Sequence, residues 1–396
     1  MAKLLEITGK AISGEWGQDD DTGTGIPVLR TTNFTNEGFV NYKNVVTRSI
    51  SKKNIAEKYL RHGDVIIEKS GGSDKQPVGR VIFFEGEENK YLFNNFTGLL
   101  RVQNPEEWLP KYVFYALYAY YRNGGTRAFE NRTTGLHNLQ VDNYVKSVDI
   151  PKLSYRKQQH ICETLDHVRD AVAYREQQLT KLDELIKARF VEMFGDLVEN
   201  PKQFPCVLLG SIMTVMPQNG LYKPQSAYVQ DKFGTPILRI DGFYNGKVTD
   251  FNNLKRLCCT DFEKERYLLV ENDIVINRVN SIEYLGKCAR ISGLQEDTVF
   301  ESNMMRFHLD DSKVNSTYIT TVLCSQYIYR QILTRAKKAV NQASINQGDV
   351  QSLNVVVPPL SLQNQFAAFV AEVDKSKLFA ELFAQSTCIL AENHSK

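Results

Sequence analysis

The chain has 396 residues, 42% of them hydrophobic and 11% aromatic, which supports ordinary buried cores and excludes a disordered chain. Its 48 Lys and Arg side chains nearly balance 46 Asp and Glu, so the formal net charge of +2 excludes a uniformly basic surface, and any nucleic-acid binding must come from local clusters. At about 150 residues per domain, this length predicts two or three domains.

The sequence contains no apolar stretch of about 18 residues and no signal-peptide pattern, so we expect a cytoplasmic protein without a membrane span. The 7 cysteines lack a C-x-x-C spacing, and the 6 histidines lack an H-x-x-x-H pair. We therefore expect reduced thiols, no disulfide framework and no metal site.

In chain order, short apolar runs predict strands and an aromatic run with helical spacing predicts a helix whose aromatic residues belong to the core. The predicted strands of the first half are 27–29, 65–67, 81–84 and 99–102, followed by the helix at 108–121. The second half repeats this order with strands at 237–240, 274–276 and 304–308 and a helix at 318–333. Each half is predicted to be a mixed α/β globule of about 150 residues.

The two halves also share sequence, as an internal repeat with an offset of about 208 residues. Gly-Ile-Pro-Val-Leu-Arg at 25–30 returns as Gly-Thr-Pro-Ile-Leu-Arg at 234–239. The other matches are 63–67 with 272–276, 78–81 with 285–288, 150–154 with 357–361, and Gln158 with Gln365. Coincidence among common strand and turn sequences is the alternative explanation.

A long helix is predicted after each globule, with Ser154 and Ser361 as candidate N-caps behind Pro151 and Pro358. Apolar residues at steps of three and four, interrupted by Arg175, are typical of a coiled coil. The apolar positions are Ile161, Leu165, Val168, Val172, Leu179, Leu182, Ile186 and Met193, then Phe366, Phe369, Val373, Ala380 and Phe383. We expect an antiparallel pair of helices about 60 and 45 Å long. The alternative is that each helix packs on its own globule.

Common catalytic motifs are absent from the sequence. It contains no G-x-x-x-x-G-K-[ST], G-x-S-x-G or H-E-x-x-H, and no H-x-E with P-C-x-x-C. The [N/D/S]-P-P-[Y/F] signature of amino-methylating enzymes is also missing, because the only Pro-Pro pair lies between Val357 and Leu360. We expect a non-catalytic chain, although an active site built from isolated residues stays open.

The segment Leu-Asp-Glu-Leu-Ile-Lys-Ala-Arg-Phe-Val-Glu-Met-Phe-Gly-Asp at 182–196, followed by Asn-Pro at 200–201, resembles the end of the central helix in the specificity subunits of type I restriction–modification systems. The matching Pro and Ser residues before the two long helices, at 151–154 and 358–361, support this resemblance, as do the matching segments at 63–67 and 272–276. It implies target-recognition domains at 1–150 and 199–357, with coiled-coil helices at 151–198 and 358–396. The abrupt start of the first domain at 4–7 departs from the lead-in at 204–210 of the second.

The resemblance also implies partners and cofactors. Each target-recognition domain would read one half of a split double-stranded DNA target, and the coil would set a spacing near one helical turn between half-sites. The coil would dock two methyltransferase subunits, which bring S-adenosylmethionine, and motor-nuclease subunits would bring ATP and Mg. No cofactor is expected in this chain.

Three polar segments in each half, which we expect to be loops, carry the donors and acceptors that contact phosphates and base edges. The first segments hold Arg30, Thr31, Thr32 and Asn33, and Arg239 and Asp241, with a structural arginine–carboxylate pair as the alternative. The second hold Lys69, Ser70, Ser73, Lys75 and Gln76, and Arg278, Asn280 and Ser281. The third, which we favour for base contacts, hold Arg127, Asn131, Arg132, Thr133, Thr134 and His137, and Lys337, Lys338, Asn341, Gln342, Ser344 and Asn346.

His137 on its own is expected to be a hydrogen-bonding loop residue and not a catalytic one. Because the two halves differ throughout these segments, we expect an asymmetric bipartite target. Three alternatives stay open: a single-chain methyltransferase or nuclease with degenerate motifs, a protein-interaction adaptor that does not bind DNA, and the same subunit serving a methyltransferase without restriction.

Overall fold

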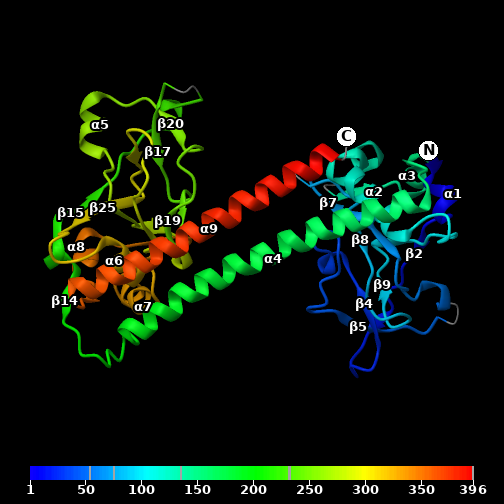
Figure 1. Ribbon diagram of the computed structural model, residues 1–396, viewed down its shortest axis with the longest axis horizontal. Helices are drawn as coiled ribbons and strands as arrows, with labels where there is room; N and C mark the ends of the chain where they lie inside the picture. Colours follow the sequence, from blue (N-terminus) through cyan, green and yellow to red (C-terminus); the bar gives the residue numbers. More distant parts are fainter. Residues whose placement is uncertain (53–54, 75, 134–135, 231–232, 395–396) are drawn as a thin grey trace. The chain divides into compact units, whose positions relative to one another are not determined.

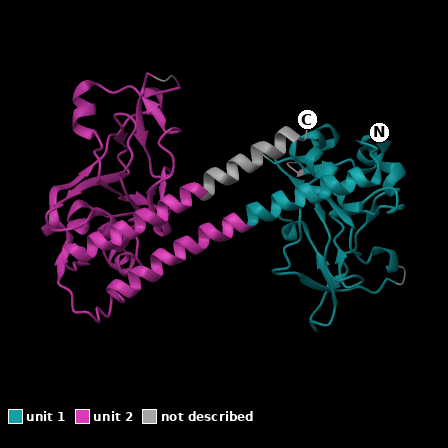
Figure 2. Cartoon of the chain, in the orientation of Figure 1, with its two compact units in different colours: residues 1–173, 387–396 teal, residues 174–386 magenta. Residues whose placement is uncertain are grey.

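The computed structural model describes residues 1–52, 55–74, 76–133, 136–230 and 233–394, without the side chains of 132–136 and 380–394. The chain divides into two compact units, coloured separately in Figure 2: unit 1 is Met1–Ala173 with Thr387–Lys396, and unit 2 is Tyr174–Ser386. Each unit is a mixed α/β structure with a hydrophobic core of its own, as the sequence predicts.

The central sheet of unit 1 has the strand order β2-β10-β6-β8, and all neighbours are antiparallel. Figure 1 labels its outer strands, β2 and β8. The inner strands β6 (Val65–Glu68) and β10 (Thr97–Leu100) are buried along their whole length, as is β8 (Val81–Phe83). Burial on both faces explains why these strands are apolar runs without alternation. The strands predicted at 65–67 and 81–84 are confirmed, and the one predicted at 99–102 lies two residues earlier.

A second sheet in unit 1 has the order β3-β5-β4-β9, in which β4 and β9 are parallel. The start of the chain pairs with the residues before the first long helix, through β1 and β13. The bounds are β1 Ala2–Lys3, β2 Ile12–Ser13, β3 Gln18–Asp19, β4 Ile26–Leu29, β5 Val46–Ser49, β9 Leu92–Phe93 and β13 Asp149–Ile150, with helices α1 Leu4–Thr8 and α3 Val141–Ser147.

Unit 2 has the same strand order. Its central sheet runs β15-β25-β21-β23 and continues into β19 and β18, and its second sheet runs β16-β20-β17-β24 with β17 parallel to β24. The bounds are β14 Cys206–Leu208, β15 Met213–Asn219, β16 Tyr228–Val229, β17 Thr235–Leu238, β18 Phe243–Tyr244, β19 Gly246–Val248, β20 Lys255–Leu257, α5 Asp261–Tyr267, β21 Ile274–Asn277, β23 Cys288–Arg290, β24 Val299–Phe300, β25 Met304–Leu309, α8 Gln347–Gln351 and β28 Asn354–Val356.

The start of unit 1 also has a counterpart in unit 2. The strand β14 pairs with β28 as β1 pairs with β13. The two residues of β1 therefore take the place of β14 in unit 1.

The aromatic segment forms one helix in unit 1 and two in unit 2. Helix α2 (Pro110–Arg122) buries three of its aromatic side chains, and the others pack partly buried against the same core, which confirms that its aromatic residues belong to the core. The buried ones are Tyr112, Phe114 and Tyr121. In unit 2 the prediction of a single helix at 318–333 is wrong, because this segment forms two helices, α6 (Ser316–Leu323) and α7 (Gln326–Arg335). The Ser325 hydroxyl accepts a hydrogen bond from the Ile328 amide and caps the second helix.

The long helices are α4 (Tyr155–Phe194) and α9 (Leu360–His394). Ser154 directly precedes α4, but Ser361 lies inside the first turn of α9, because the amides of Leu362 and Gln363 donate to the Pro359 carbonyl. The predicted N-cap Ser361 is therefore wrong by two positions.

The predicted match of Gln158 with Gln365 is wrong by the same shift. Gln158 and Gln363 are both buried, and each accepts a hydrogen bond from a backbone amide before a helix, Leu109 or Asn315. Gln365 is exposed.

Within unit 2, the last turns of α4 pack against the first turns of α9. The Phe190 and Phe194 rings lie 5.4 and 5.6 Å from the ring of Phe366, and the Lys377 ammonium pairs with Asp183 farther along. These contacts run in opposite directions along the two helices, so this segment is antiparallel. It also joins the unit 2 core, where Phe194 and Phe366 are buried.

Candidate nucleic-acid interface

The second and third polar segments of each half come together in one small sheet. In unit 1, β7 (Ser70–Gly72) joins the hairpin of β11 (Glu130–Thr133) and β12 (Leu136–Leu139), in the order β11-β12-β7. These segments are predicted as loops, and the structure corrects this: they are short strands. Their residues are mostly polar, so they lack the regular apolar alternation that reveals a half-buried strand.

Unit 2 builds the same sheet from β22, β27 and β26. Here β22 (Val279–Asn280) pairs with β27 (Ala343–Ser344), which pairs in turn with β26 (Lys337–Lys338). Two segments that are about 60 residues apart in the sequence thus meet at one surface in both units, and a hairpin is the outer part of each sheet.

The hairpin tip of unit 2 projects polar side chains into solvent. The Ala339 amide donates to the Gln342 carbonyl over 2.7 Å and closes the turn. Val340 at the tip is 99% exposed. The exposed predicted residues of this hairpin are Lys337, Lys338, Asn341 and Gln342. An exposed two-stranded ribbon with Lys, Asn and Gln side chains has the width and the donors to enter a DNA groove.

The sheet of unit 1 presents a different set of groups. Asn131, Ser73 and Gln76 are exposed, and the exposed Arg127 donates to the Asp74 carbonyl over 3.2 Å. Arg132 and Thr133 belong to β11, but their side chains lie outside the described residues, as do Lys75 and Thr134 entirely.

Three predicted contact residues have structural roles instead. Asn33 is 1% exposed, and its amide donates to the carbonyls of Asn41 and Lys43. His137 is buried with its Nδ1 3.1 Å from Glu130 Oε2, which agrees with a hydrogen-bonding residue. The Asn346 carboxamide caps α8 by accepting from the Asp349 amide. Because Asn33 and His137 are buried and held by these hydrogen bonds, we correct the interface by removing both; Asn346 is exposed beside its cap, and its contact with DNA stays a prediction.

The first polar segment mainly supports the framework. Arg239 Nε lies 3.3 Å from Glu301 Oε2, which is the structural alternative considered for this arginine. Arg30 donates to the Asn44 carbonyl over 3.2 Å. Thr31 is half-buried, and only Thr32 and Asp241 of this segment are exposed.

The remaining predicted residues lie half-buried at the base of the small sheets. Arg278 donates to the Ser302 carbonyl over 3.1 Å, and the Asn280 side chain accepts from the Ser281 amide over 2.8 Å. Ser70, Ser344 and Lys69 are half-buried beside them in their own units. The hydrogen bonds of Arg278 and Asn280 position the strands, while the exposed hairpins offer the free donors.

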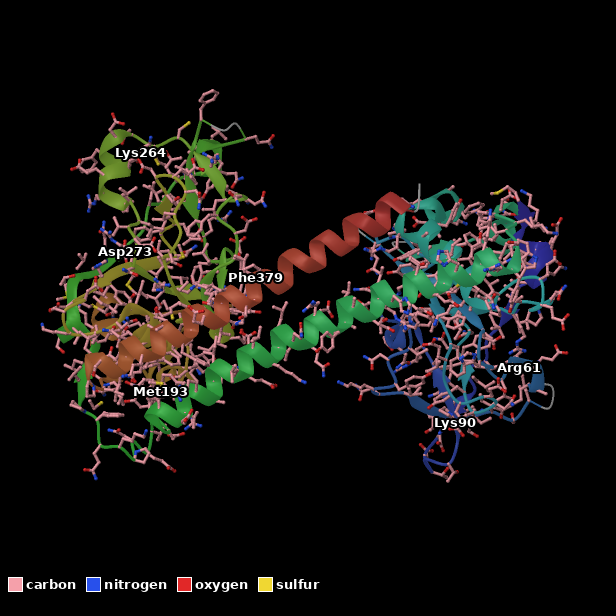
Figure 3. All side chains as sticks on the ribbon, viewed as in Figure 1. Arg61, Lys90, Met193, Lys264, Asp273 and Phe379 are labelled. Carbon is pink, nitrogen blue, oxygen red and sulfur yellow. The ribbon has the colours of Figure 1, made fainter. Side chains whose placement is uncertain are left out.

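The aspartate of each repeated Asp-(Val/Ile)-(Ile/Val)-Ile signature anchors the sheet behind the interface. Asp64 accepts from Arg101 over 2.8 and 2.7 Å, and Asp273 contacts Arg306 and His308. Asp273 is labelled in Figure 3. Both carboxylates are almost fully buried. The sequence match at this position thus marks a buried ion pair and no contact with a ligand.

Sequence reasoning missed a further pair of matching positions, Gly14 and Gly220. A Cβ at either glycine would lie within 2.6 Å of carbonyl oxygens on the neighbouring strand, so both places require glycine. The segment that follows Gly14 includes Glu15, which binds Lys52 and Lys58. These lysines are separated from the predicted polar segments in the sequence, and no motif pointed to them.

Within the described residues, no group of three or more His, Cys, Asp or Glu side chains could hold a metal ion. No helix in this same part of the chain is long and apolar enough to cross a membrane.

Residues 201–382 match the family model of the type I restriction modification DNA specificity domain. Among relatives, the EcoKI specificity subunit of Escherichia coli K12 is 24% identical over 369 residues, which are 88% of this chain and 75% of that protein. A putative MjaX specificity subunit of Methanocaldococcus jannaschii is 31% identical over 185 residues, covering 45% of this chain and 41% of that protein.

The fold is similar to solved structures at low sequence identity. The S subunit of a type I restriction–modification system from M. genitalium superposes with a TM-score of 0.58 at 14% identity, covering 99% of this chain and 93% of that one. A chain from a structure of type I complex assembly and conformational transition gives a TM-score of 0.52 at 15% identity, with the same coverage.

Proposed function

We propose that the chain is a type I restriction–modification specificity subunit, the subunit that reads a bipartite DNA sequence and is not itself an enzyme. Support comes from the match of residues 201–382 to the specificity-domain model and from relatives that are specificity subunits. In this proposal each unit reads one half-site, and methylation or cleavage is carried out by other subunits.

The observation that carries the proposal is the pair of corresponding three-stranded sheets with different exposed side chains. Unit 2 offers Lys337, Lys338 and Asn341, whereas unit 1 offers Asn131 and Gln76. Asn and Gln can pair bidentately with adenine, and Lys with guanine or phosphate. A shared framework with different tips is what reading two unlike half-sites requires, so the target is asymmetric.

The partners follow from the same proposal. Two methyltransferase subunits dock on α4 and α9 and bring S-adenosylmethionine, and restriction subunits, where they exist, bring ATP and Mg. The two long helices set a spacing near one turn of DNA between the half-sites. The complex works in the cytoplasm, where the DNA is.

The alanine substitution Asn341→Ala tests the hairpin of unit 2. We expect specific DNA binding to weaken by about 1–3 kcal/mol, because one bidentate base contact is lost. Gel-shift titration on the native target measures the change, with the exposed Gln365 on α9 as a matched control. Unchanged affinity in Asn341→Ala, or an equal loss in Gln365→Ala, would remove this hairpin from the interface. The same loss is predicted for Arg132→Ala.

Two rival functions give different results with the purified chain. A single-chain methyltransferase or nuclease would transfer methyl groups or cut DNA alone, and the proposal expects neither. A protein-interaction adaptor would bind DNA without sequence preference or not at all. Affinity that falls steeply with salt and depends on DNA sequence separates the proposal from the adaptor.

A further inference from the structure

A group of three lysines lies beside the small sheet of unit 1 and outside the hairpin. Lys52 and Lys58 both pair with one carboxylate, Glu15, and the Lys52 ammonium lies 2.8 Å from Oε2. The two ammonium groups lower the pKa of Glu15, so this carboxyl group is ionised at neutral pH. One negative charge is therefore shared by two positive ones.

The third lysine of the group, Lys69, adds a positive charge that makes no direct ion pair within the described residues. Its ammonium donates to Ser13 Oγ over 3.3 Å. Burial and the charge of Lys58 lower the pKa of Lys69, whereas the carboxylate of Asp142 raises it. Two of the three ammonium groups thus pair directly with Glu15, and the third has Asp142 at longer range, which leaves an excess of positive charge at this place. A half-buried cation without a direct ion pair is costly unless a ligand supplies an anion.

The surface at this place is hollowed and lined by groups that suit an oxyanion. A depression of about 540 Å³ is lined by Lys52, Lys58 and Glu15 together with Ser13, Ser51 and Asn95. The hydroxyl and carboxamide groups are neutral donors, and lysines are the common point-charge partners of phosphate.

The group is continuous with the proposed interface. The Lys69 carbonyl accepts a hydrogen bond from the Leu139 amide over 2.8 Å, at the end of β12. Lys69 also directly precedes β7. Lys69 therefore links the lysine group to the small sheet of unit 1.

We propose that Lys52, Lys58 and Lys69 form a phosphate clamp that grips the DNA backbone beside the half-site read by unit 1. This inference rests on the proposed function and adds to it a contact that carries affinity and no sequence preference. Unit 2 does not repeat the clamp. The Leu60 amide donates to the Tyr91 carbonyl as the Leu269 amide donates to the Thr298 carbonyl, so the two leucines occupy matching positions. Two residues before them, unit 2 has Tyr267 where unit 1 has Lys58. At the position of Lys69, unit 2 has Arg278, which is bound to the Ser302 carbonyl.

Salt dependence of binding tests the clamp, because a phosphate contact releases counterions. The slope of log K against log salt changes by about 0.9 for each phosphate contact that is lost. We expect Lys58→Gln to reduce the slope by about this amount and Lys58→Gln with Lys69→Gln by about twice as much. The ratio of affinities for target and scrambled DNA should stay unchanged, since a backbone contact weakens both equally.

Two controls separate the clamp from a general change of charge or stability. Lys58→Arg keeps the charge and should keep the slope. Lys152→Gln removes an ion-paired lysine elsewhere in unit 1, 2.7 Å from Glu107, and should also keep it. The measurement uses the full chain purified with its methyltransferase subunits, with the midpoint of thermal unfolding recorded for every variant.

The outcomes distinguish the two levels of the proposal. If the unaltered complex shows no preference for its target, the proposed function fails. If the unaltered complex prefers its target but the Lys58 and Lys69 variants keep its slope of log K against log salt, the clamp is overturned. The clamp is also overturned if the variants lose their preference for the target over scrambled DNA while the slope stays the same. A separate measurement uses inorganic phosphate as the ligand. If millimolar phosphate stabilises the unaltered chain, and the variants show no change in the salt dependence of DNA binding, the site binds free phosphate. That result would contradict the clamp.

Discussion

Replacing Asp273 with alanine is expected to lower the free energy of unfolding of unit 2 by about 3–5 kcal/mol, because the change leaves a buried cation without its partner. The Asp273 carboxylate is fully buried and accepts from Arg306 over 3.1 Å, from His308 over 2.9 Å and from the Val270 amide over 2.9 Å. Denaturant titration followed by circular dichroism measures the loss.

Asp297→Ala is the matched control, since Asp297 is exposed in the same unit. Surface substitutions of this kind usually change stability by no more than about 0.5 kcal/mol. Equal stability of the two variants would contradict the structural role given to the repeated signature. Asp273→Asn should lose less, because the carboxamide oxygen can still accept from the Val270 amide.

The second large effect is expected from Phe366→Ala in the first turns of α9. Phe366 is fully buried against Phe190 and Phe194 of α4, and the truncation should cost about 3–5 kcal/mol through lost burial and a cavity. Hydrogen exchange of the amides at the start of α9 and the end of α4 should accelerate together, because each segment buries its aromatic rings on the other.

Phe379→Ala on the same helix supplies the control for this result, because Phe379 is 75% exposed (Figure 3). Its stability should stay near that of the unaltered chain. A double-mutant cycle between Phe190 and Phe366 should give a coupling energy of about 0.5–1.5 kcal/mol. Additive losses would show that the two helices are anchored independently.

The framework could be predicted from the sequence because it is repeated. Buried strands such as 65–67 and 274–276 are apolar on both faces, and their continuous runs identify strands without any knowledge of their partners. The apolar face of the first long helix could also be predicted from the sequence, because its apolar positions, from Ile161 to Met193, are all buried or half-buried.

The site could be predicted only in part, because polar residues look alike in sequence whether they face solvent or bind the protein's own backbone. Asn341 is exposed at a hairpin tip, whereas Asn33 is buried and Asn346 caps a helix. The three-stranded sheets were missed for a similar reason, since pairing between β22 and β27 depends on contacts far apart in the chain. Lys52 and Lys58 are brought to Glu15 by the fold alone.

The central claim is that each unit reads its own half of a split DNA target. The most direct measurement is co-expression of the chain with its methyltransferase subunits, followed by genome-wide mapping of methylated adenines, for the unaltered chain and for Lys337→Gln with Asn341→Ala. The account predicts a split motif in which the variant relaxes one half and leaves the other half unchanged. A continuous motif, or equal relaxation of both halves, would contradict it.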